Sequence, residues 1–63
     1  MDRDTLFEVF KKAIVAEHEA CEFYTRAAAE TSNGEAKKLF ESFAATERNH
    51  KSTLEELYKS LKQ

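Results

Sequence analysis

The chain has 63 residues, a formal net charge of −2, no proline, one glycine and one cysteine. A weakly acidic chain without a basic cluster has no electrostatic basis for binding nucleic acid, and its apolar runs are too short for a membrane span or a signal peptide. We therefore expect a cytoplasmic protein whose small core depends on a metal ion or a partner subunit, because a single cysteine cannot form a disulfide within the chain.

The first predicted helix covers about residues 4–31. Its start fits a capping box of Thr5 and Glu8, with Asp2 or Asp4 as the alternative cap. Positions that alternate four and three apart form its apolar stripe, which consists of Leu6, Phe10, Ala13, Glu17, Ala20, Tyr24 and Ala27. The flanks of this stripe are also apolar, with Phe7, Ile14 and Cys21 on one side and Val9, Ala16 and Phe23 on the other.

The second predicted helix covers about residues 35–62 and follows a turn at about residues 32–34. Asn33-Gly34 is a strong turn signal because glycine adopts a positive φ at no steric cost, and Ser32 followed by Glu35 fits a capping box. The stripe of this helix consists of Ala36, Phe40, Phe43, Glu47, His50, Leu54, Leu57 and Leu61.

These patterns predict an all-α fold, a single domain over residues 1–63 in which two long antiparallel helices form a hairpin. Each helix would be roughly 40 Å long. Because the first helix is apolar on both flanks of its stripe, it must contact more than one neighbour. We therefore expect two hairpins to form a four-helix bundle, as a homodimer or a higher even-numbered homo-oligomer.

Three ionisable residues, Glu17, Glu47 and His50, interrupt the two apolar stripes. If the turn pivots near Asn33, residues whose numbers sum to about 66 lie level, so Glu17 faces the Glu47-x-x-His50 pair. Unpaired charges in an apolar seam are costly, and a metal ion would compensate them. The alternative is a coiled-coil hairpin in which the same residues are polar positions that set the register.

Two hairpins would provide four glutamates and two histidines, which is the ligand set of di-iron and di-manganese carboxylate bundles. Four carboxylates also balance the charge of two divalent ions. We therefore predict a metal site of Glu17, Glu47 and His50 that binds two iron ions per dimer, with manganese or zinc as alternatives. Without metal, the crowded carboxylates should repel each other and weaken the dimer near neutral pH.

Two stretches of the chain resemble motifs of the ferritin-like superfamily. Residues 17–24, Glu-His-Glu-Ala-Cys-Glu-Phe-Tyr, are similar to its first-helix motif, and residues 39–50, which end in Glu-Arg-Asn-His, are similar to the second-helix motif of rubrerythrins. The resemblance implies a ferritin-like four-helix bundle in which Glu17 and His50 are terminal ligands and Glu47 bridges the ions. It also implies that Tyr24 lies beside the site and supports it.

The sequence differs from the rubrerythrin pattern in three respects. It has two predicted helices instead of four, it lacks the rubredoxin module with its Cys-x-x-Cys pairs, and Ala20 stands where rubrerythrins carry an additional glutamate. Encapsulated ferritins, which resemble the chain in their glutamate spacing, also have two helices and form their site between subunits. The resemblance therefore implies a rubrerythrin-like half-bundle.

We expect the protein to be a non-haem di-iron oxidoreductase that oxidises Fe(II) with O2 or hydrogen peroxide, as a ferroxidase or a peroxide reductase. A peroxide reductase would need an external electron donor. The alternative function is a metal-free homodimeric helical interaction module. A third interpretation is that the chain is one piece of a larger protein.

Two further residues lie near the site in the sequence. His18 is expected to be solvated, and Cys21 is expected to act as a small apolar residue.

Overall fold

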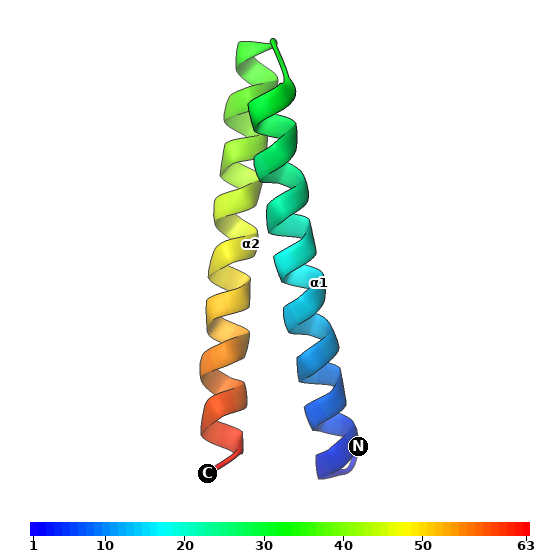
Figure 1. The fold of residues 1–63 in the computed structure, drawn as a ribbon. Coiled ribbons are helices and arrows are strands. Elements are labelled where there is room, and N and C mark those ends of the chain that lie inside the picture. The colour runs from blue at the N-terminus through cyan, green and yellow to red at the C-terminus, as the bar shows by residue number, and fades with distance from the viewer.

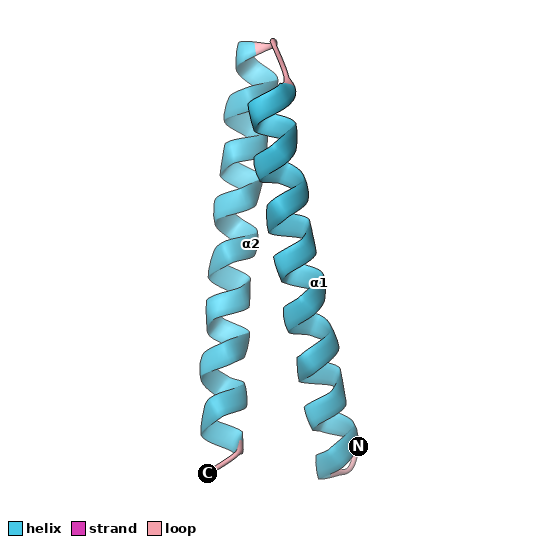
Figure 2. Ribbon diagram, in the orientation of Figure 1, coloured by secondary structure: helices cyan, strands magenta, loops and turns pink.

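The computed structural model describes residues 1–63 and contains two helices of 28 residues each, α1 (Arg3–Glu30) and α2 (Gly34–Leu61). They run antiparallel and form a hairpin of 46 × 15 × 14 Å (Figure 1). The remaining residues form the turn and the two short ends, and there is no strand (Figure 2). The predicted all-α hairpin is confirmed, with each helix beginning and ending one residue earlier than expected. Neither helix has a stretch apolar enough to cross a membrane.

The first helix is capped by Asp2 and not by a capping box of Thr5 and Glu8. The Asp2 carboxylate accepts a hydrogen bond of 2.8 Å from the backbone N–H of Thr5. This bond stabilises the ionised form, so it lowers the pKa of Asp2 below its ordinary value. The aspartate alternative of the sequence prediction is therefore the correct one.

The turn consists of Thr31, Ser32 and Asn33, and it differs from the predicted turn in two ways. Asn33, and not Ser32, caps α2, because its side-chain oxygen accepts a hydrogen bond of 2.8 Å from the backbone N–H of Ala36. Gly34 is the first residue of α2 and has no positive φ. The Thr31 hydroxyl instead closes the turn by accepting a hydrogen bond from the N–H of Asn33.

The register of the two helices agrees with the predicted pairing of residues. Tyr24 of α1 lies against Phe43 of α2 with ring centroids 5.2 Å apart, and Phe7 stacks on Tyr58 at 5.7 Å. At the open end of the hairpin, the Arg3 guanidinium donates a hydrogen bond to the backbone carbonyl of Leu61. These contacts connect level positions along the whole length of both helices, which fixes the residues that meet at the centre.

The two helices cross at a shallow angle, so that α1 passes in front of α2 beside the turn and the two lie side by side at the termini (Figure 1). Beside the turn, the small side chains of Ala28 and Ala44 are buried between them. Toward the termini, the larger rings of Phe7, Phe10 and Tyr58 pack against one another between the two helices. Only Phe10, Ala28 and Ala44 are buried among all 63 residues, so the hairpin has a thin core.

The apolar stripe of α2 is wider than the surface that α1 covers. Ala44, Lys51 and Tyr58 are buried or half-buried against α1. Phe43 and Leu57, which were predicted to lie in the seam, are instead 40% and 51% exposed. The difference arises because the predicted stripe spans two adjacent contact surfaces, and a single neighbouring helix covers only one of them.

Candidate metal centre

Glu17, Glu47 and His50 converge near the middle of the hairpin. Glu17 projects from α1, and the other two are one turn apart on the same side of α2. One ligand atom from each residue can be chosen so that all three lie within 4.8 Å of one another. Two antiparallel helices in the observed register thus bring together residues that are up to 33 positions apart in the chain.

The three side chains differ in exposure. Those of Glu17 and Glu47 are half-buried, whereas the His50 side chain is 56% exposed. His50 Nδ1 lies 3.5 Å from Glu17 Oε2 and 3.9 Å from Glu47 Oε2. Glu17 Oε2 is enclosed by protein and has no hydrogen-bond partner, so the hairpin leaves one buried carboxylate oxygen unsatisfied.

An enclosed oxygen without a hydrogen bond is expensive unless something coordinates it. A cation bound by the carboxylates and the imidazole would satisfy it. Oxygen and nitrogen donors together suit iron, manganese or zinc. The donor set of the hairpin therefore fits a divalent metal ion, and Glu17, Glu47 and His50 are the residues that would hold it.

The two carboxyl groups perturb each other. The neighbouring carboxyl of Glu17, with which Glu47 can share a proton, raises the pKa of Glu47 above its ordinary value, and desolvation and the negative charge of Glu17 act in the same direction. His50 acts in the opposite direction, but it does not cancel the shift. Two carboxylates held together compete for a proton, and a metal ion could take the place of that proton.

Tyr24 lies one heptad from Glu17, toward the turn. Its ring packs against Phe23, Phe40 and Phe43, with centroid distances of 5.3, 6.2 and 5.2 Å. Its hydroxyl makes no hydrogen bond to Glu17, Glu47 or His50 in the hairpin. The aromatic contacts hold the ring in place between the two helices, one heptad from Glu17.

A polar contact beside the site was not predicted from the sequence. Lys51 Nζ donates a hydrogen bond of 3.0 Å to His18 Nδ1, and His18 Nε2 lies 2.6 Å from a carboxylate oxygen of Glu22. His18 is half exposed, as a solvated residue would be, but it also connects the two helices. The only sequence signal was the position of Lys51, one turn after Glu47 on the side facing α1. Cys21 is a half-buried free thiol, in agreement with its expected packing role.

The pKa shift of Glu47 leads to a pH-dependence prediction for the metal-free protein. Because the folded-state pKa is raised, the folded protein binds more protons than the unfolded chain, so the contribution of Glu47 to stability is complete below the unfolded pKa and is lost as pH rises through the folded pKa. We expect the melting temperature of the metal-free protein to fall as pH rises above the ordinary pKa of a glutamate, and to fall by more than that of a Glu47→Gln variant. Thermal melts in chelator measure this, and parallel curves for the two proteins would contradict it.

Three comparisons relate the chain to known proteins. The rubrerythrin family model matches residues 8–63, which is most of the chain and includes Glu17, Glu47 and His50. No curated protein and no solved structure matches it. The family model, the helical hairpin and the carboxylate–histidine cluster agree with one another.

Proposed function

The chain belongs to the rubrerythrin family, and on this premise we propose that it is a di-iron carboxylate protein whose site is completed by a second copy of the hairpin. Each copy would contribute Glu17, Glu47 and His50, giving four carboxylates and two imidazoles for two iron ions. The observation that carries the proposal is the enclosed Oε2 atom of Glu17, which lacks a hydrogen-bond partner beside a second carboxylate and an imidazole.

The three residues would have different tasks. By resemblance to the family, Glu17 and His50 would be terminal ligands, and Glu47 would bridge the two ions. Charge supports this arrangement, since four carboxylates balance two divalent ions. Without the ions, the negative charge of the neighbouring carboxylate is not balanced, which agrees with the raised pKa of Glu47.

A bound iron pair supplies the electrons that reduce O2 or hydrogen peroxide. The residues of the chain would bind the ions, exclude water and balance the charge of the ions. Tyr24 and its aromatic neighbours would exclude water on the turn side of the site. We propose an oxidoreductase of the ferroxidase or peroxide reductase type, and a peroxide reductase would draw its electrons from an external donor. Stopped-flow oxidation of the Fe(II)-loaded protein by O2 and by hydrogen peroxide distinguishes the two.

A Glu47→Ala variant tests the metal site. We expect the wild-type protein to hold about one iron per chain after anaerobic loading and desalting, and the variant to hold far less, because the alanine removes the bridging carboxylate. Iron is measured by elemental analysis. A Glu41→Ala variant is the matched control, since Glu41 is an exposed glutamate of the same helix outside the site. Equal iron in the Glu47 and Glu41 variants would refute the proposal.

The second candidate function is a metal-free homodimeric interaction module. The observation that favours it is the set of apolar side chains that the hairpin leaves exposed, among them Phe23, Phe43 and Leu57. It predicts that a dimer forms and that metal has no effect on stability. A melting experiment with and without metal separates it from the metal-binding function.

A further inference from the structure

A basic groove runs between α1 and α2 on the side of the hairpin where Lys51 meets His18. One hollow of the groove lies beside the turn and a second lies toward the termini, and the contact between Lys51 and His18 separates them. The cations of the groove all come from α2 and are Lys37, Arg48, Lys51, Lys59 and Lys62. They are spread over residues 37–62, so they form no cluster in the sequence, and the helix brings them to one side.

Helical spacing shows that the two hollows belong to one groove. The wall formed by α1 contains Ile14, His18 and Thr25, which follow one another at intervals of four and seven residues and therefore lie in one row. The floor beside the turn consists of small side chains, among them the buried Ala28 and Ala44. A floor of small side chains lets the surface of a partner approach both helices closely.

The groove carries a surplus of positive charge. Three carboxylates lie near its five cations, since Glu41 and Glu55 line the two hollows and Glu22 pairs with His18. None of the five cations forms an ion pair with a carboxylate of the chain. The net charge of the whole chain is −2, so positive charge is concentrated in the groove and is free to attract an acidic partner.

The middle of the groove lies beside the metal ligands. Lys51 is one turn after Glu47 in α2, and His18 follows Glu17 in α1. The hairpin is only 14 Å thick in its smallest dimension, so a molecule held in the groove at the level of Lys51 lies within about one hairpin thickness of the ligands. A redox group in such a molecule would be near the iron pair without entering the site.

The groove also stays accessible in the proposed assembly. Helical spacing places the exposed side chains of Phe23, Phe43 and Leu57 on the other side of the hairpin. A second copy that covers these apolar side chains therefore leaves the groove in water, where it can bind a different partner.

We propose that the basic groove is the docking site of an acidic one-electron carrier protein. The inference rests on the proposed function, and it identifies the external electron donor by its charge and by the surface that it contacts. Two carriers each lose one electron and reduce two Fe(III) to two Fe(II). Hydrogen peroxide then takes up the two electrons and two protons from water to give two molecules of water.

The size and charge pattern of the groove favour a protein as the partner. Its cations extend over roughly 40 Å of α2, which is far longer than a small anion. Glu41 and Glu55 alternate with the cations, and they would repel the uniform negative charge of a polyphosphate, whereas an acidic protein can place a cation against each. Electron-transfer complexes are small and transient, so complementary charge suffices where a large apolar surface is absent.

Titration with a plant-type [2Fe–2S] ferredoxin, an acidic one-electron carrier of low potential, tests the surface. The amide signals of the Zn(II)-loaded protein are followed by NMR, so the measurement does not depend on iron chemistry. We expect the shifts to map to the groove, with Lys37 and Lys59 among the affected residues. The dissociation constant should rise about tenfold or more between about 0.02 M and about 0.2 M salt. Absence of binding, or shifts outside the groove, would overturn the inference.

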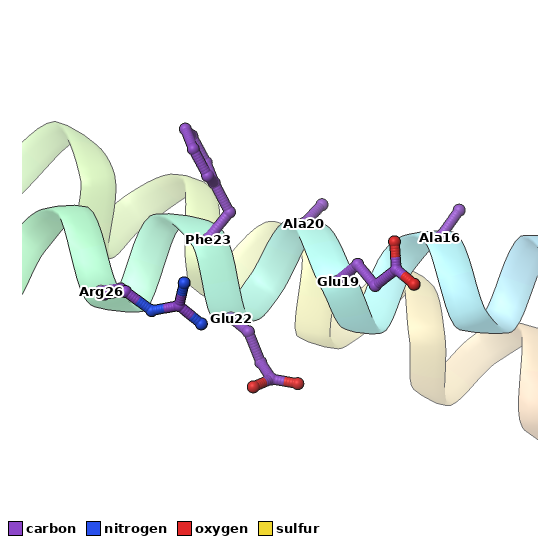
Figure 3. Close-up of a pocket in the computed structure, with 6 residues that line it drawn as sticks. All are labelled: Ala16, Glu19, Ala20, Glu22, Phe23 and Arg26. Atoms are coloured by element: carbon purple, nitrogen blue, oxygen red, sulfur yellow. The ribbon is translucent and has the colours of Figure 1, made fainter.

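Two double variants with the same change of net charge test the role of the groove. Lys37→Glu/Lys59→Glu reverses charge at its two ends and is expected to weaken ferredoxin binding about tenfold or more. Lys12→Glu/Arg26→Glu is the matched control, with a much smaller expected effect. Arg26 lies in a hollow formed by α1 alone (Figure 3), and Lys12 lies in another. Circular dichroism verifies that both variants remain helical, and equal weakening by both would overturn the assigned groove.

Reduction of the Fe(III)-loaded protein separates this inference from the proposed function. Reduced ferredoxin is expected to reduce the iron about tenfold or more slowly in the Lys37→Glu/Lys59→Glu variant than in the wild-type protein, whereas dithionite, a small reductant, should reduce both at similar rates. Iron that dithionite reduces and ferredoxin does not would overturn the docking site and leave the proposed function standing. Ferredoxin bound in the groove of a protein that holds no iron would support the docking surface and remove the proposed function.

Discussion

Loading with Fe(II) or Zn(II) is expected to raise the melting temperature of the protein by roughly 10–20 °C. A ligand present at about 100 times its dissociation constant stabilises the folded state by about 2.7 kcal/mol, and 1 kcal/mol shifts the melting temperature of so small a domain by about 4–8 °C. The physical source is the site itself. In the metal-free protein, Glu17 and Glu47 are held together and one carboxylate oxygen is enclosed without a partner, and a divalent ion satisfies both.

The measurement is a pair of thermal melts by circular dichroism, with metal and with chelator, at one protein concentration. The Glu47→Ala variant serves as the control, since it lacks a carboxylate of the cluster and should show no comparable shift. Identical melts of the wild-type protein in both conditions would favour the metal-free interaction module over the metal-binding function.

The hairpin could be predicted from the sequence because two independent signals agreed. Apolar residues repeat at helical spacing on both sides of one break, and the pairing of level residues follows from a short turn. Tyr24 meets Phe43 as that pairing requires. The caps were harder to predict, because several neighbouring polar residues compete for each one. Asp2 caps α1 in place of Thr5, and Asn33 caps α2 in place of Ser32, because of local backbone geometry that the sequence pattern does not contain.

The cluster of Glu17, Glu47 and His50 could be predicted because ionisable residues in an apolar stripe are unusual. The exposure of His50 could not be predicted, because the sequence does not show which part of an apolar stripe the neighbouring helix covers. The bridge between His18 and Lys51 was missed for a related reason. Both residues are ordinary surface types, and only the angle at which the two helices pack brings them together. Family membership favours iron among the metals that the donor set would suit.

A Phe10→Ala substitution is expected to have the largest effect of any single change in the apolar core. Phe10 is the only large side chain among the three buried residues, and its ring lies 6.1 Å from that of Tyr58. Truncation of a buried phenylalanine costs about 3–5 kcal/mol, because it removes buried apolar surface and leaves a cavity. A core of this size contributes only about 3–5 kcal/mol in total, so the metal-free variant should be largely unfolded at 25 °C.

Helicity at 222 nm and its loss in urea measure this effect. A Val15→Ala variant is the control, since Val15 is 55% exposed and its truncation should change stability by less than about 0.5 kcal/mol. Excess metal should partly restore the fold of the Phe10 variant, because Glu17, Glu47 and His50 remain intact and binding favours the folded state. If the metal-free Phe10 variant melts like the wild-type protein, the seam between α1 and α2 is not the main source of stability, and the surface around the metal ligands must contribute more.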